Sequence, residues 1–201
     1  MSARTPKKTP KKTPKNQTAL LQAELERLKA DVARAQRTIV QLETRADVDP
    51  LLEILNRRGF ERELKRSLAF LQRYKGKAAL LFLDLDGFKA VNDRHGHAAG
   101  DALLKVVAQE LSNHVRASDM VARLGGDEFG VLLWNLGPTQ AVAKARNLEM
   151  HIEGVSVVYG GVRLSVGASA GVVPLVGTAT PAQMIEAADQ AMYVRKKERR
   201  G

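Results

Sequence analysis

The sequence predicts an α/β domain of the α+β kind, in which a βαββαβ-like sheet is covered by helices. Residues 78–84 (AALLFLD) form a short, continuous apolar run, which is typical of a strand that is buried on both faces. Residues 120–124 and 128–134 flank the pair Gly125–Gly126, which is typical of a hairpin. Helical apolar spacing on both sides of these strands supplies the covering layers.

The remaining elements each have a local signal. In chain order, helices are expected over 53–74, 100–115 and 139–152, and strands over 155–159 and 162–173. Gly160–Gly161 is the expected turn between those last two strands. Thr180 is a suitable N-cap and Pro181 suits a first helical turn, so a last helix is expected to run to about Lys197.

Composition limits the class of protein. The chain has 201 residues, 44% of them apolar, which is enough for one globular domain with a core. It contains no cysteine, which excludes disulfides, thiolate chemistry and cysteine-ligated metal sites. No apolar stretch is long enough to span a membrane, and no apolar run follows the basic N-terminus as in a secretory signal. We therefore expect a cytoplasmic protein without membrane insertion.

The first 18 residues form a basic tail with a TPKK repeat. They contain no acidic residue and six of the basic ones, which are Arg4, Lys7, Lys8, Lys11, Lys12 and Lys15, within a net charge of +10. Its prolines disfavour helix and it has almost nothing apolar to bury, so it is predicted to be disordered. It is either a solubilising arm or an electrostatic contact for nucleic acid or an acidic surface. It has no aromatic residue to stack on bases, so specific base recognition is not expected.

Residues 19–48 carry a heptad repeat. The core positions are Leu21, Leu25, Leu28, Val32, Ala35, Ile39, Leu42 and Ala46, spaced alternately by four and three. Such a repeat predicts a coiled coil that joins two chains into a homodimer. The alternative is a single amphipathic helix that packs on its own domain.

Two acidic motifs carry chemistry. Asp84 ends the buried strand in DLDGFK, and Asp127 and Glu128 lie in the turn of RLGGDEFG. A strand end and a neighbouring hairpin can bring carboxylates together at one sheet edge, where they would suit a hard divalent cation and a substrate phosphate. Gly125 and Gly126 permit positive φ and a close approach of a ligand. Taken alone, this turn is a weak signal and favours an ordinary hairpin.

These motifs resemble those of the GGDEF-type diguanylate cyclases. The matching stretches are LFLDLDGFKAVNDRHGHAAGD, LGGDEFGVLL, SAGVV and ADQAMYVRKKERR, in family order. The likeness covers residues 47–201, and the catalytic domain is placed at 49–201. It implies a palm-like core, similar to that of adenylyl cyclases and polymerases. It also implies synthesis of cyclic di-GMP from two GTP, with release of two pyrophosphates and one GTP held by each subunit of a dimer.

The resemblance assigns the catalytic centre. It implies that Asp84, the backbone carbonyl of Leu85 and Asp127 bind Mg²⁺, for which Mn²⁺ is a possible substitute. Asp127 is also the expected base for the attacking 3′-hydroxyl, and Glu128 stands beside it as the second catalytic carboxylate.

The resemblance also assigns substrate contacts. Asn92 and Asp101 match the guanine-binding pair, and a carboxylate at Asp101 suits the N–H donors of guanine. His97 matches a histidine on the substrate side, and Gly126 allows close approach. The expected triphosphate contacts are the amides of Gly87 and Phe88 and the side chains of Lys89, Lys196 and Arg200.

Arg116 and Asp119 resemble the family's RxxD inhibitory site, where the product cyclic di-GMP binds. An arginine suits such a ligand because it pairs with phosphate and stacks on guanine. The alternative is a local Arg–Asp pair after a helix. Where the family often supplies another arginine, this sequence has Asn147, beside Arg146.

One departure concerns the entry to the domain. The family's DxLTGLxNRR is DPLLEILNRR here, so Leu52 and Glu53 replace a Thr-Gly pair, which bears on signal relay rather than on chemistry. We interpret the chain as a diguanylate cyclase. The alternatives are a catalytically inactive protein that binds GTP or cyclic di-GMP, and a nucleic-acid-bound protein that acts through its tail.

Overall fold

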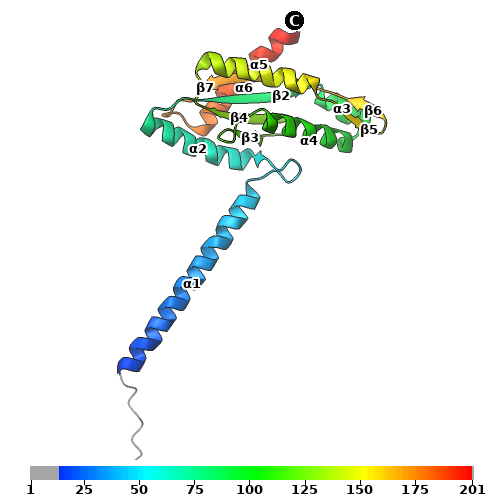
Figure 1. The fold of residues 1–201 in the computed structure, drawn as a ribbon. Helices are drawn as coiled ribbons and strands as arrows, with labels where there is room; N and C mark the ends of the chain where they lie inside the picture. The colour runs from blue at the N-terminus through cyan, green and yellow to red at the C-terminus, as the bar shows by residue number, and fades with distance from the viewer. Residues whose placement is uncertain (1–13, 201) are drawn as a thin grey trace, which may run out of the picture. The chain divides into compact units, whose positions relative to one another are not determined.

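The computed structural model describes residues 14–200, without the side chains of 14–16, 37–45 and 200. The chain divides into two compact units, residues 1–45 and 46–201, and each is described by itself. Most of the predicted basic tail, residues 1–13, lies outside the described residues. Helix α1 (Pro14–Ala46) begins within that predicted tail, four residues before its expected end (Figure 1).

Helix α1 exposes its apolar heptad positions. Leu21, Leu25, Leu28 and Val32 are between 51% and 61% exposed in the single chain. Ile39 and Leu42 belong to the same predicted repeat, but their side chains lie outside those described. The two-chain coiled coil therefore stays a prediction, and the exposed apolar side chains on α1 are what a partner helix would cover.

The second unit is built on a five-stranded mixed sheet with covering helices, which confirms the predicted fold class, although its short strand Leu55–Asn56 lies in a stretch that was predicted to be helical. The strands are β1 (Leu55–Asn56), β3 (Met120–Arg123), β4 (Glu128–Trp134), β2 (Ala78–Asp86) and β7 (Gly167–Pro174), in that spatial order. β2 lies between β4 and β7 and pairs antiparallel with both, while β1 pairs parallel with β3. The predicted hairpin of β3 and β4 is confirmed.

Helices cover both faces of this sheet. Apolar side chains of β2 alternate between two cores, with Leu81 and Leu83 on one face and Leu80 and Phe82 on the other. The first face is covered by α4 (His97–Asn113) and α5 (Pro138–Gly154), and the second by α2 (Arg57–Tyr74) and α6 (Pro181–Arg200). Figure 1 shows α5 and α2 on opposite sides of the sheet.

The structure differs from the sequence prediction in the last strand. The stretch 162–173, expected as one strand, is divided into β6 (Val162–Leu164) and β7. β6 forms a separate two-stranded ribbon with β5 (Val157–Tyr159), closed by Gly160 and Gly161 at positive φ. The break lets β7 join β2 in the main sheet.

Two helix starts also differ from the prediction. α2 begins at Arg57 rather than at residue 53, because Asn56 caps it by accepting a hydrogen bond from the Gly59 amide at 3.0 Å. α4 begins at His97 rather than at residue 100. It follows a short helix that was not predicted, α3 (Phe88–His95), directly through Gly96 at φ 83°. None of the helices in the described part of the chain is long and apolar enough to cross a membrane.

Candidate active site

Four carboxylates gather where β2 ends and β4 begins, and we call Asp84, Asp86, Asp127 and Glu128 the acidic edge. Asp84 is in register with Glu128 on β4 and with Ser169 on β7. The Leu85 amide donates to the carbonyl of Asp127 at 3.1 Å, which extends the ladder into the turn. The structure thus brings together the two acidic motifs that are separate in the sequence.

The Gly-Gly turn is tight for a reason other than the one expected. Neither Gly125 nor Gly126 has a positive φ, so the expected use of that conformation is wrong. A Cβ on Gly125 would stand 2.4 Å from Oε2 of Glu128, so a side chain there would displace that carboxylate from its present position. A Cβ on Gly126 would meet nothing within 4 Å, and this residue is exposed as a ligand contact requires.

Arg123 braces this turn, although it was not among the residues predicted for the site. Its guanidinium donates to the carbonyls of Gly125 at 3.1 Å and Gly126 at 2.9 Å. It also contacts Asp49 at 3.3 Å, and Asp49 accepts from the amide of Leu51 at 2.9 Å. The segment that enters the domain is therefore tied to the acidic turn. The available signal was an arginine directly before LGGDEF.

A second arginine holds Glu128. Arg57 donates through Nε to the carbonyl of Leu124 at 2.7 Å, and its guanidinium lies 3.5 Å from the Glu128 carboxylate. The pKa of Glu128 is raised. Burial raises it most and the charge of Arg57 lowers it, while the negative charges of Asp189, Asp84 and Asp127 raise it further. Glu128 is thus a positioned, paired carboxylate beside Asp127.

Lys196 brings a positive charge to the acidic edge from α6. Its ammonium group donates to Asp84 and lies 3.3 Å from Asp86. Burial lowers the pKa of Lys196, but the contacts with Asp84 and Asp86 outweigh it, so the pKa is raised. The pKa of Asp84 is raised as well. Burial raises it, the contact with Lys196 lowers it, and the charges of Asp127 and Asp86 raise it further.

The donor set of the acidic edge fits a hard divalent cation. It consists of oxygens only, and after burial the neighbouring carboxylate charges add to the raised pKa values of Asp84 and Glu128, which is the electrostatic situation that a cation relieves. Asp84, Asp127 and the Leu85 carbonyl are the residues that would hold Mg²⁺ or Mn²⁺. Lys196 already places one positive charge against Asp84.

The start of α3 offers backbone donors beside this edge. Gly87 is its N-cap at φ 84°, and no side chain among the described residues caps this helix end. The first amides of a helix are free to bind an anion, and the helix dipole favours negative charge there. Phe88 is anchored in the core, and Lys89 is exposed next to it. This is the expected arrangement for phosphate binding.

The predicted guanine contacts lie where α3 packs on α4. The Oδ1 atom of Asn92 is buried and has no hydrogen-bond partner among the described residues. A Cβ on Gly100 would stand 1.9 Å from that atom, so glycine permits the close packing. Asp101 follows on α4 with an exposed side chain, and His97 is exposed at the start of α4. The unpartnered amide oxygen of Asn92 and the exposed carboxylate of Asp101 are both acceptors, which suits a ligand with N–H donors. The side chain of Arg200, a predicted triphosphate contact, lies outside those described.

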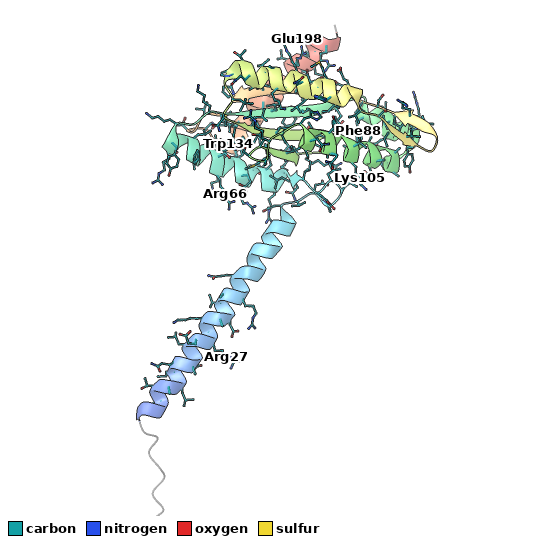
Figure 2. All side chains as sticks on the ribbon, viewed as in Figure 1. Arg27, Arg66, Phe88, Lys105, Trp134 and Glu198 are labelled. Atoms are coloured by element: carbon teal, nitrogen blue, oxygen red, sulfur yellow. The ribbon has the colours of Figure 1, made fainter. Side chains whose placement is uncertain are left out.

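Arg116 and Asp119 lie at the other end of β4. Asp119 accepts from the Trp134 amide and from the Arg116 amide, both at 3.0 Å. These residues border a cavity of about 280 Å³ that Lys144 and Asn147 of α5 also line. Figure 2 labels Trp134 and Phe88 towards opposite ends of the sheet. The predicted inhibitory residues are therefore distant from the acidic edge.

The comparison with known proteins identifies the class to which this fold and site belong. Residues 46–201 match the family described as "Diguanylate cyclase, GGDEF domain". The chain belongs to the GGDEF-domain diguanylate cyclase family. It is 38% identical over 186 residues to diguanylate cyclase TpbB of Pseudomonas aeruginosa, covering 89% of this chain and 42% of that protein. It is also 38% identical over 172 residues to the probable diguanylate cyclase DgcE of Escherichia coli, covering 85% and 16%. The chain thus spans less than half the length of these relatives.

Solved structures agree with the fold. The GGDEF domain of TpbB matches with a TM-score of 0.70 at 38% identity, covering 75% of this chain and 89% of that one. A sensory box/GGDEF family protein from Caulobacter crescentus matches with a TM-score of 0.71 at 35% identity, covering 76% and 99%. The coiled coil and GGDEF domain of DgcB from the same organism, in complex with c-di-GMP, matches with a TM-score of 0.75 over 89% of this chain and 95% of that one. At 24% identity that last match supports the fold alone.

Proposed function

We propose that the chain condenses two GTP into cyclic di-GMP and releases two pyrophosphates. The observation that carries this proposal is the acidic edge. There Asp84 is in register with Glu128, and Asp127, the residue before Glu128, is the next to pair with β2. The uncapped start of α3 lies next to it in the chain, directly after β2. Carboxylates beside phosphate donors are the elements that a nucleotidyl transfer requires.

The reaction needs a base and a held phosphate. Asp127 takes the proton of the 3′-hydroxyl, and the freed oxygen bonds to the α-phosphorus of the opposing GTP. The bond from that phosphorus to the α–β bridging oxygen breaks, and pyrophosphate leaves with the electron pair. The amides at the start of α3, with Lys89 and Lys196, hold the phosphates in line. Bound Mg²⁺ or Mn²⁺ would neutralise negative charge that builds on the phosphate oxygens.

Guanine selection rests on the contact of α3 with α4. Asp101 accepts from the N–H groups of guanine, and the orphaned Oδ1 of Asn92 takes a further donor. Adenine presents an acceptor where guanine presents N1–H, so ATP would leave Asp101 unpaired. GTP is therefore the expected substrate.

Each chain holds one GTP, so two chains must bring their acidic edges together. The exposed heptad side chains of α1 support a homodimer through a coiled coil. A linked pair replaces a bimolecular encounter with an effective concentration in the millimolar range. Arg116 and Asp119 are proposed to bind the product as a feedback ligand, with Lys144 and Asn147 bordering the same cavity.

A turnover assay tests the proposal. The purified chain is incubated with GTP and Mg²⁺, and cyclic di-GMP and pyrophosphate are quantified. Asp127→Asn should lower the rate by at least about 100-fold, because it removes the base without changing the volume. Asp93→Asn is the matched control, since Asp93 is an exposed carboxylate on α3. The turnover rate of this variant should equal that of the wild type.

The alternative is a catalytically inactive protein that binds GTP or cyclic di-GMP. Nucleotide binding without product at any Mg²⁺ or Mn²⁺ concentration would establish that alternative. Normal turnover by Asp127→Asn would instead refute the role of Asp127 in the mechanism.

A further inference from the structure

Two imidazoles and one carboxylate meet at the C-terminal ends of α4 and α5. Glu110 lies in the last turn of α4, His114 is its C-cap, and His151 lies in the last turn of α5. One nitrogen of each histidine and one oxygen of Glu110 all lie within 4.8 Å of one another. We propose that this histidine cluster binds a first-row divalent transition metal, with Zn²⁺ as the ion that fits best.

The distances are close to those of a coordination shell. Oε1 of Glu110 lies 3.3 Å from Nδ1 of His114 and 3.8 Å from Nδ1 of His151. The two ring centroids are 3.6 Å apart. In a tetrahedral zinc site with bonds of about 2.0–2.1 Å, neighbouring ligand atoms stand about 3.4 Å apart. The two carboxylate–nitrogen distances therefore match a coordination shell, and a turn of the two rings out of their stack would complete the site.

A backbone contact orients the first histidine. Nδ1 of His114 lies 2.9 Å from the carbonyl oxygen of Glu110, so a proton on Nδ1 is donated to that oxygen. The same nitrogen lies nearest the Glu110 carboxylate, so an ion bound to it would take the place of that proton, and Zn²⁺ binding would release a proton.

The surroundings favour a bound cation. Leu111 and Ile152 are fully buried beside the cluster and hold the two helix ends in place. Helix C-termini carry partial negative charge, and two of them meet here, where the ammonium group of Lys144 already donates to the carbonyl of His114. The side chains of Glu110, His114 and His151 are 27%, 30% and 41% exposed, so one side remains open for water as a further ligand.

The ligand types separate this cluster from the acidic edge. Imidazole nitrogen suits Zn²⁺ and its neighbours in the first row, whereas Mg²⁺ prefers oxygen donors such as those of the acidic edge. The chain would therefore hold two cations of different chemical class. This inference does not rest on the proposed cyclase activity.

The test is a Zn²⁺ titration of the full chain without an affinity tag, after removal of metals by a chelator. Calorimetry is done in excess Mg²⁺, so that the acidic edge is occupied. We expect one Zn²⁺ per chain with a micromolar or lower Kd. At Zn²⁺ about 100 times Kd, the Tm should rise by about 5–10 °C.

Matched histidine variants decide where the ion binds. His151→Gln and His114→Gln should each weaken Zn²⁺ binding at least about tenfold, because each removes one ligand. His95→Gln, on α3, should bind as the wild type does. Co²⁺ provides a spectroscopic check, since its visible absorption on binding to nitrogen ligands should be lost in His151→Gln. Circular dichroism verifies that each variant is folded.

Three results would overturn the inference. They are the absence of micromolar binding, equal binding by wild type and both cluster variants, and displacement of Zn²⁺ by Mg²⁺. The last result would place the ion on the acidic edge. None of these results depends on GTP turnover, so failure here and failure of the proposed function are distinguishable.

Discussion

The surroundings of the two ends of β4, at Glu128 and at Trp134, differ in charge. At Glu128 the strand lies beside Asp84, and α6 supplies Lys196 as the balancing cation. At Trp134 it lies beside the Arg116–Asp119 loop, where the Asp119 carboxylate is already taken by two backbone amides. The exposed Arg116 and the half-buried Lys144 therefore set the charge of that end.

This difference indicates which ligand each end suits. The acidic end suits a phosphate only through a cation, whereas the basic end suits a phosphate directly. Between them lie the buried residues 129–133, and the six steps of an extended strand separate the two ends by about 20 Å. A ligand at the basic end would therefore not compete with GTP for space.

At the acidic end, the largest effect after that of Asp127→Asn is expected from removing the charge of Lys196. Lys196→Gln should lower kcat/KM about 10–100-fold, because it deletes a charge-assisted contact to phosphate. Steady-state kinetics with GTP measure this. Lys197→Gln is the control on the same helix, since Lys197 is exposed and lies over the ring of Tyr193. Equal losses in both variants would mean that general surface charge, rather than the acidic edge, is responsible.

The next largest effect is expected from preventing dimerisation, which would bring the acidic edges of two chains together. Val32→Asp places a charge at an exposed heptad core position of α1 and should make the chain monomeric at low micromolar concentration. Its specific activity should then rise with protein concentration. Ala30→Asp adds the same charge outside the heptad core and should remain dimeric. Light scattering with kinetics distinguishes them, and a dimeric Val32→Asp would show that another surface joins the chains.

At the basic end, we expect a change in feedback. Arg116→Ala should raise the inhibition constant for cyclic di-GMP about tenfold, because one charged contact to phosphate is lost. Progress curves with added product measure it, and noncompetitive inhibition of the wild type is expected from the separation of the ends. Arg146→Ala, an exposed arginine on α5, should keep the wild-type constant. Identical inhibition of wild type and Arg116→Ala by cyclic di-GMP would contradict a regulatory role for the basic end.

The smallest effect tests what anchors the helix that carries Lys196. Glu149 of α5 is buried, accepts from the Ala170 amide at 2.8 Å and pairs with Arg195 of α6 at 3.5 Å. Glu149→Gln should cost about 2 kcal/mol of unfolding free energy, because Arg195 loses a buried partner. Calorimetry should show a Tm lower by about 4–8 °C. Glu186→Gln, exposed on α6, should leave the Tm unchanged. An unshifted Tm in Glu149→Gln would show that packing alone anchors α6.

Much of the fold and of the candidate site was predictable from local patterns. The buried run 78–84 and the pair 120–124 and 128–134 predicted the central strands, because side-chain alternation and turn residues are short-range properties. Asp84 and Asp127 were predicted to meet because one ends a strand and the other lies in the adjoining turn. α3 was missed because eight residues rich in polar side chains carry little periodicity, and its packing on α4 depends on Gly100.

The sequence by itself therefore determined the heptads, the central strands and the placing of acidic residues at a sheet edge. The motif resemblance assigned Lys196 to phosphate binding, but only the tertiary structure decided that this lysine, 112 residues from Asp84, donates to the Asp84 carboxylate. It likewise decided that Arg123 joins the acidic turn to Asp49 and that His114 meets His151. The physical reason is range: periodicity and turn chemistry act over a few residues, whereas these contacts exist only because helices and strands pack against one another.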